Sequence, residues 1–182
     1  MRAETKRNRE VLIMPTVVED EVQKARQIGL TYLTARARSI HEVREKLRRA
    51  EFEAAVIDQV IENLKRLNLL DDREFARRWV ESRIEGKKLA GRRKFLQDLQ
   101  RKGIEQDIIA EVLEEFAEDL ESGTAAAKLL RRQLWRYNGL DERKAKRRML
   151  GLLARRGYEQ ELALKTVEQV WEEMQSNDLE RD

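Results

Sequence analysis

The sequence predicts an all-α protein made of three tandem three-helix repeats, and three observations support this prediction. Charged residues make up 40% of the 182 residues, aromatic residues make up 5%, and there is one proline. This mixture, rich in Ala, Glu, Lys, Leu and Arg, is typical of helical proteins. No segment alternates apolar and polar residues for long enough to predict a sheet. A short pattern also recurs along the chain.

The recurring pattern is clearest in residues 98–109, DLQRKGIEQDII, and residues 152–163, LLARRGYEQELA. Both contain a leucine, a basic pair, a glycine and the dipeptide EQ, and they align without a gap. A fainter third copy places Leu47 in register with Leu99 and Leu153, at spacings of 52 and 54 residues. Such self-similarity indicates stacked helical units, none of which can bury its apolar face alone.

The fainter copy has Glu51 where the other two have Gly103 and Gly157. We interpret the two glycines as helix stops, because glycine readily adopts the left-handed conformation of a C-terminal cap. A glutamate adopts a positive φ only at a cost in free energy. We therefore expect the turn at Glu51 to differ from the other two.

Local signals place three helices in each repeat, beginning with repeat 1. Residues 22–36 carry apolar side chains at roughly helical spacing. The sequence SIHE at Ser39–Glu42 is a capping box, which opens a second helix that runs to about Arg49. A third helix begins near Glu53 and continues through Leu67.

Repeat 2 opens at Asp71 or Asp72, either of which can cap a helix. Two glycines in IEGKKLAGRRKF end that helix and start the next one. Repeat 3 follows the same plan, with YNGLDERKA between its first and second helices. In this register Leu64, Phe116 and Val170 are equivalent core positions.

We therefore divide the chain into five segments. These are a flexible N-terminal tail (1–19), repeat 1 (20–70), repeat 2 (71–121), repeat 3 (122–175) and a C-terminal tail (176–182). Repeats that cover one another's apolar faces favour a monomer.

The composition also bears on where the protein works. The sequence contains no cysteine, which fits a reducing compartment. No apolar run approaches the ~20 residues needed to span a bilayer. The basic N-terminus has only a short apolar stretch, which Pro15 interrupts, and it lacks a small-residue cleavage site. We expect a cytoplasmic protein that does not interact with membranes.

The sequence offers little for catalysis. Its one histidine, His41, lies within the capping box, and neither a GxxxxGK[ST] phosphate loop nor a GxGxxG fingerprint occurs. The adjacent carboxylates Asp71 and Asp72 are better explained by helix capping than by metal binding. We therefore expect no enzymatic activity, no cofactor and no bound metal.

Positive charge is concentrated in residues 83–102 and 128–156, and an acidic segment follows the first of these. A stacked array with basic stripes presents an extended surface to polyphosphates or to acidic proteins. Basic residues in the last turn of a helix also complement the helix dipole, so some of them need no partner. We expect Trp79, Trp135 and Trp171 in the core or between repeats, and not as stacking platforms for bases.

Several motifs resemble the RecX family, the bacterial regulators of RecA recombinase. They are DD-x-x-FA at Asp71–Ala76, a glycine followed by basic residues at Gly91–Arg93, and KGI at Lys102–Ile104. The flanking motifs S-x-x-E-V-x-x-K-L at Ser39–Leu47 and L-x-R-R-G-Y at Leu153–Tyr158 resemble the other repeats of that family. Their order and spacing together are more specific than any one of them.

The resemblance covers about Val22–Met174 and implies an elongated, curved array of three three-helix repeats. It also implies binding within the groove of the RecA–single-stranded DNA filament, inhibition of RecA's ATPase, strand-exchange and co-protease activities, and weak binding to single-stranded DNA alone. The family has no catalytic residues. From the charge pattern we expect filament and DNA binding by basic residues on the middle helices and at their ends: Arg44, Arg48, Arg92, Arg93, Lys94, Arg101, Lys102, Arg147, Arg148, Arg155 and Arg156.

Two other functions stay open on the sequence alone. A free-standing DNA-binding protein without a filament partner would bind bare DNA tightly and with a steep salt dependence. A helical adaptor for an unrelated protein would use its charges only for solubility.

Overall fold

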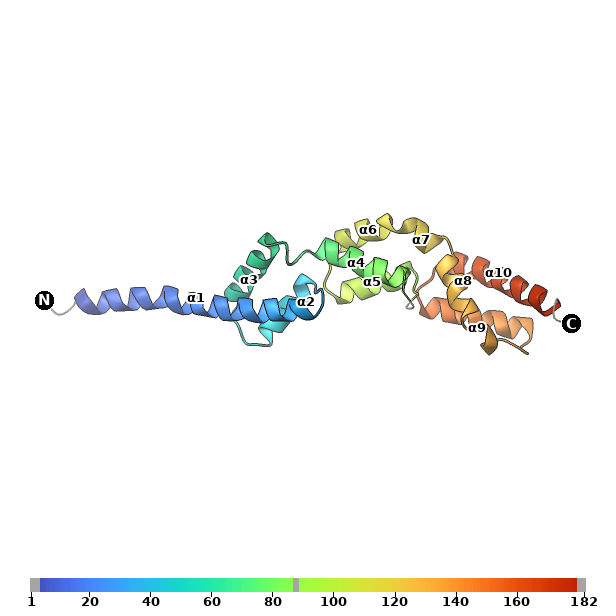
Figure 1. Cartoon of the computed structure of the whole chain (residues 1–182), viewed down its shortest axis with the longest axis horizontal. Coiled ribbons are helices and arrows are strands. Elements are labelled where there is room, and N and C mark those ends of the chain that lie inside the picture. Colours follow the sequence, from blue (N-terminus) through green and yellow to red (C-terminus); the bar gives the residue numbers. More distant parts are fainter. Residues whose placement is uncertain (1–3, 87–88, 180–182) are drawn as a thin grey trace. The chain divides into compact units, whose positions relative to one another are not determined.

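A computed structural model describes residues 4–86 and 89–179 (Figure 1). These residues form helices and turns and contain no strand, so the all-α prediction is confirmed. The helices are α1 (Glu4–Ala35), α2 (Ile40–Arg48), α3 (Ala54–Arg66), α4 (Asp72–Ile84), α5 (Arg92–Arg101), α6 (Gln106–Glu115), α7 (Ala117–Glu121), α8 (Thr124–Arg131), the 3-10 helix η1 (Leu134–Arg136), α9 (Glu142–Arg155) and α10 (Gln160–Leu179).

The chain folds as two compact units. Unit 1 contains the residues up to Phe75 together with Lys102–Ile104. Unit 2 contains Ala76–Arg101 and the residues from Glu105 onward.

Helices α1, α2 and α3 form the first three-helix repeat, in unit 1. As predicted, Ser39 and Glu42 form a capping box at the start of α2. The Ser39 hydroxyl accepts a hydrogen bond from the Glu42 N–H (3.1 Å), and the Glu42 carboxylate accepts one from the Ser39 N–H (3.2 Å). Val43 and Leu47 of α2 are completely buried, as is Leu64 of α3. Apolar residues spaced three and four apart therefore give each helix one face toward a shared core.

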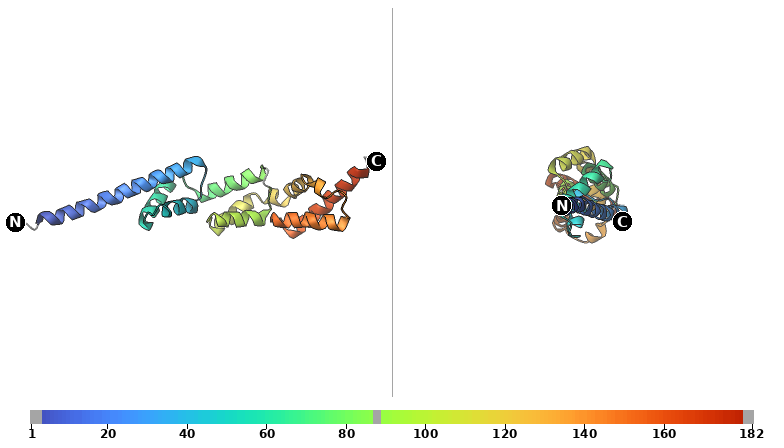
Figure 2. Two further views of the ribbon diagram at one scale, coloured as in Figure 1. Left: turned by 90° about the horizontal axis from the view of Figure 1, so that it is seen from below. Right: turned by 90° about the vertical axis from the view of Figure 1, so that its left-hand side faces the viewer.

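Helix α1 is longer than the helix predicted for the start of repeat 1. It runs without a break from Glu4 to Ala35, as Figures 1 and 2 both show. The predicted boundary between tail and repeat, at residues 19 and 20, falls inside this helix, so the structure places no division there. Val22 and Ala25 of α1 are buried in the core of repeat 1. Residues 1–3 of the predicted tail lie outside the described residues.

The two adjacent carboxylates at the start of repeat 2 cap different helices. Asp71 accepts a hydrogen bond from the Glu74 N–H (3.0 Å) at the start of α4. Asp72 accepts one from the Ile40 N–H (2.9 Å) at the start of α2. Asp71 thus has the predicted capping role, and Asp72 satisfies an otherwise orphaned donor of repeat 1.

The third helix of repeat 2 is interrupted at Phe116, which separates α6 from α7. Phe116 has φ −106° and ψ 17° and is only half-buried, whereas Leu64 and Val170 are 0% exposed. The prediction that these three are equivalent core positions is therefore wrong for Phe116. The backbone leaves the helix at this residue, and Leu120 of α7 is buried instead.

Repeat 3 consists of α8, α9 and α10, with η1 between α8 and α9. Its core, which lies within unit 2, includes Leu130 of α8, Met149 and Leu153 of α9, and Val167 of α10. Helix α10 extends to Leu179, so it continues into the predicted C-terminal tail, of which residues 180–182 lie outside the described part.

A contact that we call the first joint ties the turn after α5 to the start of α2, within unit 1. The buried Ser39 hydroxyl donates a hydrogen bond to the Lys102 carbonyl (2.6 Å). A Cβ on Gly103 would overlap the side chain of His41. Burial of Glu42 opposes its ionisation, but hydrogen bonds from Arg36, the Ser39 N–H and Lys102 together lower its pKa. The carboxylate therefore stays charged beside the joint.

The second joint repeats this contact within unit 2, between the turn after α9 and the start of α5. Gly91 lies 52 residues after Ser39, and its N–H donates to the Arg156 carbonyl (2.9 Å), while the Arg93 N–H donates to the Gly157 carbonyl (3.2 Å). A Cβ on Gly157 would overlap the Lys94 backbone nitrogen and lie 2.7 Å from the Lys94 Cβ. Gly157 has φ 77°, so both its conformation and its surroundings require glycine.

The turn after α2 corrects one expectation. Glu51 adopts φ 63°, close to the 74° of Gly103 and the 77° of Gly157, so its turn does not differ in backbone conformation. Glu51 is exposed, and its side chain extends into solvent. A positive φ alone is thus tolerated in a non-glycine residue here, whereas the close approach seen at the two joints requires glycine.

This distinction predicts the effect of Gly157→Ala. The substitution should lower the free energy of unfolding by about 3–4 kcal/mol, because left-handed strain and overlap with Lys94 act together. Gly139→Ala is the matched control, since Gly139 has φ 70° but no atom within 4 Å of an added Cβ. It should cost only about 1–2 kcal/mol in urea denaturation. Equal losses of unfolding free energy in the two variants would show that Gly157 is not crowded by Lys94 at the second joint.

A second prediction concerns Tyr158, whose buried hydroxyl has no hydrogen-bond partner among the described residues. Burial raises the pKa of Tyr158 from 10.0 to about 12. The unfolded chain therefore loses this proton first, and stability falls as the pH rises from 10.0 toward 12. Tyr158→Phe should be as stable as the wild type or more stable at neutral pH.

Between pH 9 and pH 11, the free energy of unfolding of Tyr158→Phe should rise by about 1 kcal/mol relative to that of the wild type, as measured by urea denaturation. A constant difference across that range would show that Tyr158 does not titrate as the structure requires.

Candidate functional site

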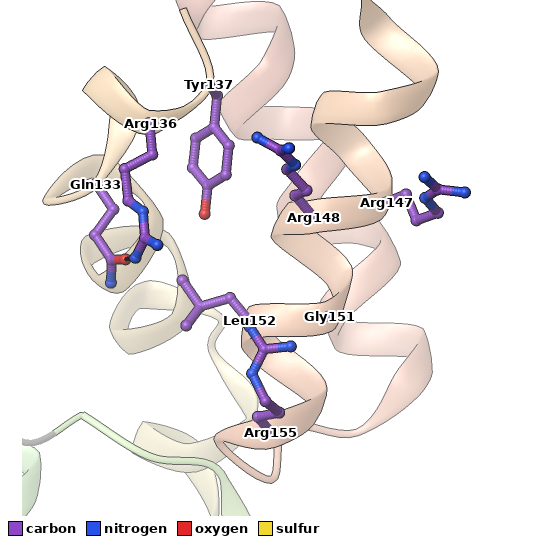
Figure 3. A pocket seen from close by; sticks show the side chains of 8 residues that line it. All are labelled: Gln133, Arg136, Tyr137, Arg147, Arg148, Gly151, Leu152 and Arg155. Atoms are coloured by element: carbon purple, nitrogen blue, oxygen red, sulfur yellow. Dashed lines mark hydrogen bonds between the residues drawn. The ribbon is translucent and has the colours of Figure 1, made fainter. Parts of the chain in front are cut away.

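A basic pocket of about 510 Å³ lies in repeat 3, between α9 and the segment around η1 (Figure 3). The lining side chains include four arginines and no carboxylate. The residues that line it are Gln133, Arg136, Tyr137, Arg147, Arg148, Gly151, Leu152 and Arg155. Its chemistry is therefore that of an anion-binding site.

Helix α9 supplies one wall because of its residue spacing. Asp141 caps the helix by accepting a hydrogen bond from the Lys144 N–H (2.9 Å). Ala145, Met149 and Leu153 form the buried face. Another face carries the pocket residues of α9, at intervals of one helical turn: Arg147, Arg148, Gly151, Leu152 and Arg155.

The opposite wall comes from the short segment after α8. Its turns are closed by hydrogen bonds from the Gln133 N–H to Leu130 O (2.8 Å) and from the Tyr137 N–H to Leu134 O (2.8 Å). Tyr137 is buried and fixes the segment against the core of repeat 3. Arg136 Nη1 donates to Gln133 Oε1 (2.9 Å), which holds its guanidinium on this side of the pocket.

Among the residues that the structure describes, no carboxylate pairs with the pocket arginines of α9. The side chains of Arg147, Arg148 and Arg155 form no hydrogen bond or ion pair with any described residue. Lys146, which immediately precedes Arg147 in the sequence, instead pairs with Glu142 (2.6 Å) and with Glu168. Carboxylates of the same chain thus neutralise the charge of Lys146, whereas the arginines on the pocket side of α9 keep their positive charge.

The Tyr137 hydroxyl adds a neutral donor to this pocket. Burial raises the pKa of Tyr137, although Arg136 and Arg155 act in the opposite direction. The phenol therefore stays protonated at neutral pH and can donate a hydrogen bond to an anion. Figure 3 shows its oxygen between the side chains of the two walls.

The other predicted binding residue in repeat 3 is used differently. Arg156 does not line the pocket, and its Nη1 donates to the Leu89 carbonyl (3.2 Å) beside the second joint. Of the four predicted residues in this repeat, the structure thus brings three together and gives the fourth a structural contact.

In repeat 2 most of the predicted binding residues have partners within the chain. Arg92 donates to Leu113 O (3.1 Å) and Glu114 (3.3 Å), which fastens the start of α5 to the end of α6. Lys94 pairs with Asp98 (2.6 Å), and Arg101 contacts the same carboxylate.

The side chain of Arg93 is exposed and has no ion pair with a described residue. Lys102 pairs with Glu42 (3.2 Å) and lies 5.4 Å from the centre of the Phe75 ring.

In repeat 1 both predicted residues form surface ion pairs. Arg44 pairs with Asp58, and Arg48 pairs with Glu45. Exposed ion pairs are weak, so these arginines can exchange partners. They are not part of the basic pocket.

The tryptophans divide into three environments. Trp171 is 8% exposed, in agreement with the predicted core position. Trp79 is half-buried and packs edge-on against Phe95, at 5.8 Å between ring centres. Trp135 is 73% exposed, so the prediction of a packed position is wrong for this residue. The residue belongs to η1, whose three residues have no buried side chain.

Three pocket residues in and beside η1 were not predicted from the sequence: Gln133, Arg136 and Tyr137. The signal was present in RRQLWRYNG, where basic and aromatic residues alternate. Such alternation is typical of nucleic-acid-binding surfaces. It was outweighed by the general tendency of tryptophan to be buried in helical proteins.

The described residues contain no group of three or more histidine, cysteine, aspartate or glutamate residues placed to hold a metal ion. None of their helices combines the length and the apolar character needed to cross a membrane.

Comparison with known families identifies each of the three repeats. The models of the first, second and third three-helix domains of RecX match residues 25–64, 71–113 and 121–178. The chain belongs to the RecX family. The three repeats predicted from the sequence are therefore the three RecX domains, and the predicted family is confirmed.

Known RecX proteins match this chain over most of its length. The regulatory protein RecX of Streptomyces coelicolor is 37% identical over 154 residues, which cover 85% of this chain and 81% of that protein. The regulatory protein RecX of Thermobifida fusca is 34% identical over 164 residues, covering 90% and 86%. These names support a regulatory role for this RecX-family chain.

Solved structures confirm the RecX fold. The crystal structure of RecX from Lactobacillus salivarius has a TM-score of 0.75 at 22% identity and covers 84% of this chain and 97% of that one. A second RecX crystal structure has a TM-score of 0.76 at 24% identity, covering 86% and 77%.

Proposed function

We propose that this protein binds the RecA–single-stranded DNA filament and inhibits or destabilises it. It thereby lowers RecA's ATP hydrolysis, strand exchange and co-protease activity, and it acts by binding and not by catalysis. The resemblance to RecX supports the filament as its partner. We further propose that it works in the cytoplasm as a monomer.

The observation that carries this proposal is the basic pocket of repeat 3. Arg147, Arg148 and Arg155 line it, and no described carboxylate pairs with their side chains. A nucleoprotein filament presents phosphodiesters and acidic side chains, both of which match planar guanidinium groups. Binding a charged partner at this pocket therefore breaks no internal ion pair.

The contribution of each other predicted residue to filament binding depends on the free energy needed to break its contacts within the chain. Arg93 is exposed and needs no rearrangement. Arg44, Arg48 and Arg101 must exchange a surface ion pair, which costs little. Arg92, Lys102 and Arg156 also hold backbone carbonyls or partly buried partners, so we assign them mainly to the fold.

The proposal predicts the effect of Arg147→Glu/Arg148→Glu on RecA. The double variant should need a roughly tenfold higher concentration to inhibit RecA's single-stranded-DNA-dependent ATP hydrolysis, because two phosphate or carboxylate contacts are reversed. The matched control is Arg143→Glu/Lys144→Glu, which makes the same charge change on the same helix but outside the pocket lining. It should inhibit nearly as well as the wild type.

Thermal melting of both variants shows whether each is folded. Equal inhibition by wild type and pocket variant would remove the pocket from the filament contact. No inhibition by the wild-type protein, at low or moderate salt, would overturn the proposed function itself. Tight binding of the wild type to bare DNA, without any effect on RecA, would favour the free-standing DNA-binding protein.

A further inference from the structure

An exposed indole lies beside Arg136, one of the residues that line the basic pocket. Trp135 is 73% exposed, the most exposed of the large apolar side chains described. It immediately precedes Arg136, whose guanidinium lines the pocket and lies 5.8 Å from the Trp135 ring centre. A single exposed apolar side chain is common, but an indole beside a cluster of cations has the composition of a site that binds single-stranded nucleic acid.

The pocket provides the groups that a phosphodiester needs. Three guanidinium groups without internal acidic partners can each donate to phosphate oxygens, and the protonated Tyr137 hydroxyl adds a neutral donor. Gly151 leaves room for the Arg155 guanidinium, since a Cβ there would lie 3.3 Å from Arg155 Nη1. Gln133, Arg136 and Tyr137 face Arg148 and Leu152 across the cavity, whereas the Arg147 side chain points outward at its edge (Figure 3).

The combination of cations and indole favours single-stranded nucleic acid over an acidic peptide. A peptide of glutamates or aspartates would use the arginines and leave the indole uncovered. A base offers a flat π surface to the indole while its phosphate lies among the guanidinium groups. Only a strand whose bases are unstacked can present a base in this way, because bases in a duplex are paired and stacked.

We propose that the basic pocket and Trp135 form a subsite for single-stranded nucleic acid, in which Arg147, Arg148 and Arg155 hold the phosphodiester backbone and Trp135 stacks on a base. This inference rests on the proposed function and specifies how part of that function is performed. It assigns Trp135 a direct contact with the nucleic acid. It also requires that the protein binds a single strand without RecA, even if weakly.

The test is titration of the full-length protein with an oligothymidylate of about eight nucleotides, without RecA, followed by tryptophan fluorescence. Stacking of a base on Trp135 should quench its emission. Trp135→Ala should lower the affinity by roughly tenfold, within the range found for loss of one base–aromatic stack. Trp79→Phe is the control for fluorescence, because Trp79 packs against Phe95 and not at the pocket. That variant should keep both the quenching and the affinity.

Salt dependence separates the two parts of the subsite. For Trp135→Ala, the plot of log affinity against log salt should shift downward without a change of slope, because no phosphate contact is lost. For Arg147→Glu/Arg148→Glu, the slope itself should become shallower. Unchanged affinity of Trp135→Ala would overturn the proposal. So would binding of an oligoglutamate as tightly as the oligothymidylate, with neither ligand affecting Trp135.

The RecA ATPase assay keeps this failure distinct from failure of the proposed function. If Trp135→Ala binds the oligothymidylate as the wild type does and both still inhibit RecA, the stacking subsite is wrong and filament regulation stands. If the wild type binds the oligothymidylate through Trp135 but never inhibits RecA, the subsite stands and filament regulation is wrong.

Discussion

The close approach of a turn to the start of a helix is the constraint on which the rest of this structure depends. In each unit the turn that follows a middle helix lies against the first residues of the middle helix of the repeat before it. A carbonyl from the turn, Lys102 O or Arg156 O, accepts a hydrogen bond from Ser39 or Gly91. In unit 2 the contact satisfies backbone N–H groups that a helix start otherwise leaves unpaired, those of Gly91 and Arg93. At the second joint, adjacent arginines have different environments, because Arg155 lines the basic pocket and Arg156 donates to the Leu89 carbonyl.

Much of this arrangement could be predicted because it is local or periodic. The capping box at Ser39–Glu42, the helix from Glu53 to Leu67 and the alignment of Leu47 with later leucines depend on neighbouring residues and on helical spacing. The role of Gly157 was predicted only in part, because its left-handed φ is local whereas its crowding comes from Lys94, 63 residues earlier. Glu51 shows the difference, since it adopts the same φ with a side chain.

The candidate site was harder to predict than the fold. Charge density identified Arg92 and Arg147 equally, but the sequence does not show that Arg92 is held by Leu113 O and Glu114 while Arg147 has no ion pair with a described residue. Such differences arise from residues that the fold brings together over long separations. The misplacement of Trp135 has the same origin, because its exposure depends on the short η1 segment and not on a periodic helix.

Hydrogen exchange at the start of α5 is the most direct test of the repeat joint. The amides of Gly91 and Arg93 occupy a helix start, where exchange is ordinarily fast, yet each donates to a carbonyl of the turn after α9. Both amides should exchange much more slowly than those of Glu142 and Arg143, at the start of α9. Exchange at the same fast rate in both places would contradict this prediction, because the joint would then not persist in solution.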